Sequence, residues 1–362
     1  MQTEHDAVKA KARVAMVRGE DRVANLRGAL EAVIDELPWT TYRRVLVKPN
    51  LVVSHAQHAI THRNTLETIL ALLRQRYQGM LTVAEGCAIE PTLRAFEAHR
   101  YPELAQRYAC NLVDLNSDDT ATVELIGRGK HPIQVEISRT LLQSDCRISV
   151  TVPKTHDAVM FTGSIKNIIM AGLVNRRVAD TPRRARLLDR IGRAAFGHGN
   201  GWGSDKAAMH QHPSIMNLNL ARVAPLVWPH LSVIDGYVAM EGNGPIWGTP
   251  VEWQVAFAGV DPLAVDVTAL ELMGFRLDEI GYLHHCTKLG LGKFLPDEIT
   301  VVGNTSRTQV ERNFVRHPRE TMQRNWKTAD IDDWLLRPLR PTAPPSTMDQ
   351  AKEGGTADDR CR

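Results

Sequence analysis

A loop with reactive side chains, followed by a helix start, is the segment of this sequence best suited to bind a ligand. Lys154 and His156 follow the apolar, β-branched run 147–152, and a helical pattern then begins near Ser164. We expect Ser164 to be the N-cap of that helix. A helix start has free backbone N–H groups and partial positive charge, and Lys166 adds a full charge. The loop and the helix start are therefore predicted to bind a carboxylate or a phosphate.

Two residue types in this segment can transfer protons near neutral pH. Histidine titrates close to neutrality, and burial can lower the pKa of a lysine toward it. We expect His156 or Lys154 to act in proton transfer, while Lys166 and the helix start bind the anion. The predicted catalytic set is Lys154, His156, Lys166 and Asn167.

Four short apolar segments each end in side chains that can bind a ligand or move a proton. In an open α/β sheet, ligands bind outside the carboxyl ends of the strands. If these strands are parallel, their ends converge on one rim; the alternative is that they are ordinary polar residues of surface loops. The four ends carry Lys48 with Asn50, Glu85, Lys154 with His156, and Asp235.

The glycine-rich segment 240–245 follows Asp235 closely and offers further contacts. It is neither a dinucleotide-binding fingerprint nor a P-loop, because the required spacings are absent. Its glycines could let the backbone approach a ligand, with Glu241 and Asn243 facing it; a simple turn is the alternative. The predicted substrate-binding set is Lys48, Asn50, Ser164, Asp235, Glu241 and Asn243.

A divalent metal is left open as a cofactor. The chain has 14 histidines, and imidazole and carboxylate groups are common metal ligands. His62 and Glu85 are the candidate ligands, although no local spacing such as H-E-x-x-H supports them, and an ordinary surface or core histidine is the alternative. The five cysteines are scattered and form no C-x-x-C pair, which argues against a zinc ribbon or an iron–sulfur cluster and fits a reducing cytoplasm.

The alternation of apolar strands and amphipathic helices predicts an α/β fold with a mostly parallel sheet covered by helices on both faces. One large domain is expected over 1–336, with a helical, Arg- and Gly-rich insertion or lid at 174–229 and a disordered tail at 337–362. Within the insertion, the arginines of 183–193 form either a solvated face or a clamp over an anion. Strands are expected at 12–17, 45–47, 81–84, 147–152, 231–234 and 255–260, and helices after Asp21 and at 61–77, 91–99 and 262–273.

The charge balance and hydropathy limit the partners of the protein. Lys and Arg number 44 and Asp and Glu 41 in 362 residues, a net charge of +3, which is too balanced to indicate nucleic-acid binding. No secretory signal and no membrane-spanning run are recognised. We therefore expect a cytoplasmic protein whose partner is a small anionic substrate.

Several of these motifs together resemble domain-of-unknown-function family 362, a prokaryotic family without a settled activity. Some of its members are described as iron–sulfur proteins; this chain lacks the clustered cysteines, so the resemblance does not imply a cluster here. The lysine and asparagine near a glycine–helix junction are also distantly similar to the lactate racemase family, which has a nickel-pincer cofactor. The matching segments are 47–51, 61–62, 85–86, 154–156, 163–167, 235–236, 240–248, 258–261, 265–266 and 273–274.

The sequence favours a cytoplasmic enzyme that acts on a small anionic metabolite by lysine and histidine acid–base chemistry, with metal assistance left open. Isomerisation, epimerisation, elimination and redox tailoring are all compatible with these residues. The alternative is a non-catalytic protein that binds a metal or an anionic cofactor for maturation or delivery.

Overall fold

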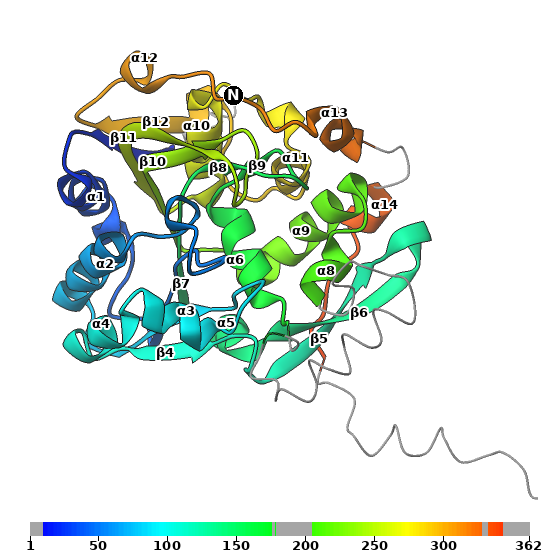
Figure 1. Cartoon of the computed structure of the whole chain (residues 1–362), viewed down its shortest axis with the longest axis horizontal. Coiled ribbons are helices and arrows are strands. Elements are labelled where there is room, and N and C mark those ends of the chain that lie inside the picture. Colours follow the sequence, from blue (N-terminus) through cyan, green and yellow to red (C-terminus); the bar gives the residue numbers. More distant parts are fainter. Residues whose placement is uncertain (1–9, 176–177, 179–204, 328–331, 343–362) are drawn as a thin grey trace, which may run out of the picture.

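The protein is built on one large, twisted sheet (Figure 1). The computed structural model describes residues 10–175, 178, 205–327 and 332–342. Short β-branched and apolar segments form the strands, as expected for a sheet that is buried on both faces. In spatial order the strands are β12 (Ile299–Gly303), β1 (Ala12–Arg18), β11 (Thr249–Gly259), β10 (Leu231–Glu241), β7 (Cys146–Thr151), β2 (Arg44–Lys48), β3 (Met80–Glu85) and β4 (Asn111–Asp114).

Most neighbouring strands run parallel. β10, β7, β2, β3 and β4 form a continuous parallel set, and β1 pairs in parallel with β12. β11 is antiparallel to both of its neighbours, β1 and β10. The predicted class, an α/β fold with a mostly parallel sheet, is confirmed.

Helices cover both faces of the sheet and form two separate cores. Successive strand residues point to opposite faces, so Val45 and Val47 pack into one core and Leu46 into the other. On the first face lie α1 (Arg22–Glu31), α2 (Arg63–Arg76), α3 (Thr92–Ala98) and α4 (Tyr101–Arg107). On the second face lie α6 (Ser164–Gly172), α9 (Pro213–Val227), α10 (Pro262–Leu272) and α11 (Gly281–Lys288) (Figure 1).

The remaining elements are short and surround this body. β5 (Thr120–Ile126) and β6 (Pro132–Ser138) form a two-stranded antiparallel hairpin that packs against α9, and β8 (Lys154–Thr155) pairs with β9 (Phe161–Thr162). The other helices are α5 (Arg139–Gln143), α8 (Asp205–Met209), α12 (Arg307–Val310), α13 (Glu320–Gln323) and α14 (Asp332–Leu335). Short 3-10 turns occur at Ile34–Glu36, Gln57–Ala59, Arg128–Lys130, Leu277–Glu279, Pro296–Glu298 and Arg324–Trp326.

One predicted strand end was wrong. The sequence placed Asp235 just after the end of a strand, but β10 continues through Glu241. Its antiparallel pairing with β11 extends the strand, with an irregularity between Gly236 and Val238. A glycine at position 236 suits this bend, because a Cβ there would lie 2.9 Å from the Val255 carbonyl oxygen. Asp235 therefore lies inside β10, one residue beyond the level at which the neighbouring parallel strand β7 ends.

The predicted insertion and tail are described only in part. α9 is apolar around most of its circumference and lies in the second core, so this part of the predicted 174–229 insertion is not a lid. The Arg-rich helix of 183–193 and the glycine cluster of 197–203 lie outside the described residues. The predicted disordered tail begins too early, because Thr342 exchanges two backbone hydrogen bonds with Thr122. The part of the tail after Thr342 lies outside the described residues.

A search of the described helices for a membrane span found none that is long and apolar enough to cross a bilayer.

Candidate functional site

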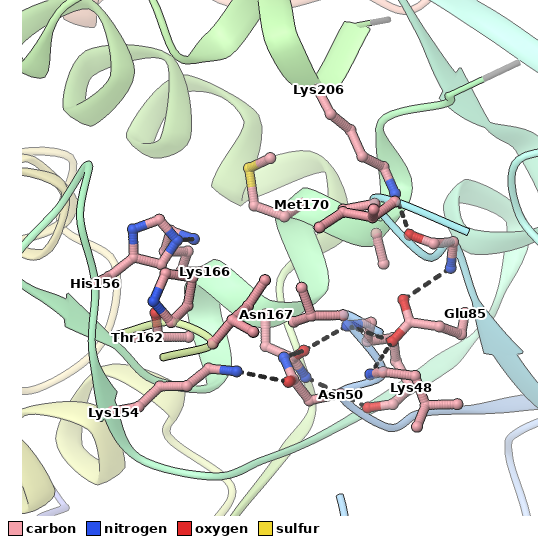
Figure 2. Close-up of a pocket in the computed structure, with 18 of the residues that line it drawn as sticks. Lys48, Asn50, Glu85, Lys154, His156, Thr162, Lys166, Asn167, Met170 and Lys206 are labelled. Atoms are coloured by element: carbon pink, nitrogen blue, oxygen red, sulfur yellow. Dashed lines mark hydrogen bonds and ion pairs between the residues drawn. The ribbon is translucent and has the colours of Figure 1, made fainter. Parts of the chain in front are cut away.

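A cavity of about 250 Å³ opens beside the carboxyl ends of β2 and β3, between β8 and α6 (Figure 2). It contains most of the side chains that the sequence placed at strand ends. Lys48, Asn50, Glu85, Lys154 and His156 all line it, together with Lys166 and Asn167 from α6. The other lining residues are Leu51, Val52, Gly86, Ala88, Ile89, Asp157, Thr162, Met170, Ala171, Lys206, His210, Pro245 and Ile246.

A buried ion pair forms one side of the cavity. Lys48 and Glu85 are the last residues of the neighbouring parallel strands β2 and β3, so their side chains meet, with Nζ 3.2 Å from Oε2. The Glu85 carboxylate also accepts the backbone N–H groups of Leu51 (2.7 Å) and Gly86 (2.8 Å). These contacts fix the loop that follows β2. Burial lowers the pKa of Lys48, and the Glu85 charge opposes that shift.

Asn167 connects α6 to this ion pair. Its Oδ1 accepts hydrogen bonds from Lys48 Nζ and from Asn50 Nδ2 (2.8 Å). Its Nδ2 donates to Ser149 Oγ (3.0 Å) and to the Val150 carbonyl (3.1 Å), which fixes the orientation of the amide. Asn167 therefore holds Lys48 and Asn50 in place and also lines the cavity, and the catalytic role that the sequence predicted for it stays a prediction.

Lys154 projects from β8 toward the same network. Its Nζ donates to Asn50 Oδ1 (2.9 Å) and to the Ala59 carbonyl, and the side chain is 1% exposed. Burial lowers the pKa of Lys154 well below its ordinary value, and the charges of Lys166 and Lys48 lower it further.

Lys166 and His156 form a second pair, on the other side of the cavity (Figure 2). Lys166 Nζ lies 2.8 Å from His156 Nε2. His156 Nδ1 lies 3.0 Å from the Ala158 backbone N–H and 3.0 Å from Asp157 Oδ1. Burial lowers the pKa of Lys166 to about 7, and burial together with the Lys166 charge lowers that of His156.

This pair has two arrangements, which differ by one proton on Lys166 and in the ring nitrogen of His156 that carries its proton. With the ring proton on Nε2, His156 donates to a neutral Lys166 amine, and Nδ1 accepts from Ala158. With the ring proton on Nδ1, His156 donates to Asp157 and accepts from a charged Lys166. In both arrangements each ring nitrogen of His156 has a hydrogen-bond partner, so the pair has the chemistry of a general acid and base.

Lys206 is a cavity residue that the sequence analysis missed. It belongs to α8, and its Nζ donates to the Gly86 carbonyl. Burial lowers its pKa to about 8. It follows no strand and belongs to no recognised motif, so only the packing of α8 against this edge brings it to the cavity.

The described lining is rich in buried positive charge. The exposed fractions of Lys48, Lys154, Lys166 and Lys206 are 3%, 1%, 5% and 6%. Two carboxylates line the same cavity, Glu85, which is buried, and Asp157, whose side chain is 43% exposed. A buried ammonium that lacks a carboxylate partner is costly. The arrangement therefore favours an anion in the cavity or neutral amines in its absence.

The helix start predicted to bind an anion is already occupied by a side chain of the protein. Gly163, not Ser164, is the N-cap of α6. The carboxylate of Asp266 accepts from the backbone N–H groups of Ser164 (2.7 Å) and Ile165 (3.0 Å) and from Ser164 Oγ (2.8 Å). A Cβ at Gly163 would lie 2.5 Å from that carboxylate, so glycine is needed there. Ser164 is thus a structural residue here and does not line the cavity.

Three other predicted ligand contacts also lie outside the cavity lining. Asp235 accepts from Thr65 Oγ1 and lies 3.7 Å from Arg22, so it joins β10 to the helices of the first face. Glu241 accepts from the Val315 backbone N–H (2.9 Å), and Asn243 is exposed. The glycine segment that carries Glu241 and Asn243 packs against β8, where Thr155 Oγ1 donates to the Gly242 carbonyl. Pro245 and Ile246 line the cavity.

The two candidate metal ligands, His62 and Glu85, make different contacts. His62 is the N-cap of α2 and accepts from the Asn64 backbone N–H (3.1 Å), whereas Glu85 faces the cavity and binds Lys48. Among the described residues, no group of three or more His, Cys, Asp or Glu side chains is arranged to hold a metal ion. His62 does not line the cavity that Glu85 faces.

Fold and site together define an α/β protein with a lysine-lined cavity at the carboxyl edge of its sheet. Residues 45–271 match the family model described as Domain of unknown function (DUF362), so the chain belongs to this family and the predicted resemblance is confirmed. It is 24% identical over 306 residues to the thylakoid-associated protein sll1697 of Synechocystis sp., which covers 83% of this chain and 81% of that protein. The structure of the lactate racemase apoprotein from Thermoanaerobacterium thermosaccharolyticum aligns with a TM-score of 0.40 and 13% identity, covering 85% and 87% of the two chains.

Proposed function

We propose that this protein is an enzyme that binds a small anionic metabolite, a carboxylate or a phosphate, and transfers a proton through Lys166 and His156. The observation that supports this most is the convergence of four buried lysines on one cavity that also contains the Lys166–His156 pair, 2.8 Å apart.

The lysines favour an anion because of their surroundings. Lys48 and Glu85 neutralise each other, whereas Lys154 and Lys206, among the described residues, donate to neutral oxygens of amide and carbonyl groups. In a low-dielectric cavity, a bound carboxylate or phosphate would stabilise the charged forms of these amines. The volume of about 250 Å³ suits a small metabolite.

The proton-transfer role follows from the contacts of the Lys166–His156 pair. One end of the pair faces the cavity through Lys166, and the other reaches Asp157 through His156 Nδ1. Asp157 is partly exposed, so a proton taken from the substrate has a route toward solvent. Isomerisation, epimerisation and elimination all need such a transfer next to a carbonyl or carboxylate group.

A two-stage experiment tests the proposal. Small carboxylates and inorganic phosphate are first ranked by the thermal stabilisation that they give to the protein. The carboxylates that stabilise it are then incubated in D₂O, and the loss of their carbon-bound protons is followed by ¹H NMR. We expect exchange with the wild type and exchange slowed by about 100-fold with His156→Gln. Recovery of every ligand with its protons intact would contradict the proposal and favour a binding protein.

A further inference from the structure

We propose that Lys166 is the nucleophile of this site and forms an imine with a substrate that carries an aldehyde or ketone beside its anionic group. The inference rests on the proposed function, since it assumes that an anionic metabolite binds in the lysine-lined cavity. It adds a covalent step and a substrate class, the small oxo acids.

The contacts of the four lysines separate Lys166 from the others. Lys48 contacts the oxygens of Glu85 and Asn167, Lys154 those of Asn50 and Ala59, and Lys206 the Gly86 carbonyl. Oxygen acceptors suit a charged ammonium. The hydrogen-bond partner of Lys166 within the described residues is a nitrogen, His156 Nε2.

A nitrogen partner suits a neutral amine. In the arrangement in which the Ala158 N–H donates to His156 Nδ1, the ring proton lies on Nε2, from where it donates to the Lys166 lone pair. Met170 lies one helical turn beyond Lys166 and lines the cavity as well, so an apolar side chain accompanies the amine. Burial lowers the pKa of Lys166 to about 7, which leaves a large fraction of neutral amine at physiological pH.

The neighbouring lysines supply the rest of the site. Lys154, held by Asn50, and Lys206, held by the Gly86 carbonyl, line the same cavity, so they can bind the carboxylate of an oxo acid. A carboxylate held there places the adjacent carbonyl carbon inside the cavity, where Lys166 also lies. A second cation near an amine favours its neutral, nucleophilic form.

The reaction balances without an oxidant or a reductant. The neutral amine attacks the carbonyl carbon, and a C–N bond forms as the C=O double bond becomes a C–O single bond whose oxygen takes the proton carried by His156 Nε2. The positively charged nitrogen returns one proton to Nε2. Nε2 then passes that proton to the hydroxyl group, which leaves as water as the C=N bond forms, and the nitrogen gives its second proton back to Nε2. The product is one C=N bond between the substrate and Lys166 and one molecule of water.

Reductive trapping tests the inference. The full-length protein is incubated with pyruvate or glyoxylate and sodium cyanoborohydride, and the intact mass and a peptide map are then measured. We expect one reduced adduct per chain, on Lys166, and suppression of it by excess lactate, which has the anion but no carbonyl. Lys166→Arg should lose the adduct, and Lys11→Arg, at an exposed lysine before β1, should keep it.

Thermal shifts with the same compounds distinguish the two ways of failing. If pyruvate and lactate both stabilise the protein but no adduct forms on Lys166, the imine inference is wrong and the anion site stands. An adduct on Lys154 or Lys206 in place of Lys166 would also overturn the inference. If neither compound stabilises the protein and no adduct forms, the proposed function fails along with it.

Discussion

Replacing Lys166 with methionine should change how the stability of the protein depends on pH. Lys166 is 5% exposed, and burial lowers its pKa from 10.5 to about 7. The unfolded chain then binds this proton more tightly than the folded protein does. The folded state is therefore penalised at and below neutral pH, and the penalty is lost as the pH rises from about 7 toward 10.5.

The magnitude follows from the two pKa values. Their full difference corresponds to about 5 kcal/mol of free energy. Between about pH 7 and pH 9 only part of this is recovered, and linkage gives a gain of about 2 kcal/mol in the free energy of unfolding from Lys166 alone. Lys166→Met lacks this group, so its stability should rise by about 2 kcal/mol less than that of the wild type over the same interval.

Urea unfolding at several pH values measures this difference directly. The midpoint and slope of each curve give the free energy of unfolding by linear extrapolation. Contributions of the other titrating groups are largely shared by the two proteins and cancel in the comparison. Lys11→Met is the matched control, because Lys11 is exposed and does not line the cavity; it should follow the wild type.

Parallel pH dependences of the wild type and Lys166→Met would refute the reasoning. Such a result would mean that Lys166 keeps its ordinary pKa in the folded protein, through solvation or through the charge of Asp157, which opposes the effect of burial. A difference of the opposite sign, in which the wild type loses stability relative to the variant as the pH rises, would refute it as well.

Three further changes have defined outcomes. Asp266→Ala removes the acceptor of two α6 N–H groups and should lower the free energy of unfolding by about 2–4 kcal/mol in urea unfolding. The control Asp278→Ala, at a half-exposed carboxylate that pairs with Arg276, should cost about 0.5 kcal/mol or less. His156→Gln should slow proton exchange into a bound substrate by about 100-fold in the ¹H NMR assay while affinity is retained. Glu85→Gln removes the charge beside Lys48 and should tighten phosphate binding about threefold in calorimetry; unchanged affinity would contradict this.

The fold class could be predicted because the strand segments have a clear pattern of apolar residues. The runs at β2, β3 and β7 are short, apolar and separated by helical segments, and this pattern indicates a parallel sheet without further information. The same pattern located Lys48, Glu85 and Lys154, since carboxyl ends of parallel strands share an edge. These residues lie around one cavity in the structure.

The wrong predictions for Ser164 and Asp235 and the missed residue Lys206 have a common physical cause. In each case the contacts that decide the role of the side chain come from residues far away in the sequence. Nothing near Ser164 shows that Asp266, a hundred residues later, occupies the start of α6. Nothing near Asp235 shows that β11 extends β10 past it. Lys206 reaches the cavity only through the packing of α8. Local patterns identify strand ends, but long-range pairing decides which polar groups are already satisfied and which face a ligand.

The central claim is that the lysine-lined cavity binds a small anion, and calorimetric titration tests it most directly. Inorganic phosphate and pyruvate are titrated into the wild type and into Lys154→Met, with circular dichroism to verify that the variant is folded. We predict saturable binding of at least one of them, at one site per chain, weakened about tenfold or more in Lys154→Met. The absence of binding of both anions to the wild type, or equal affinity in the folded variant, would contradict the account.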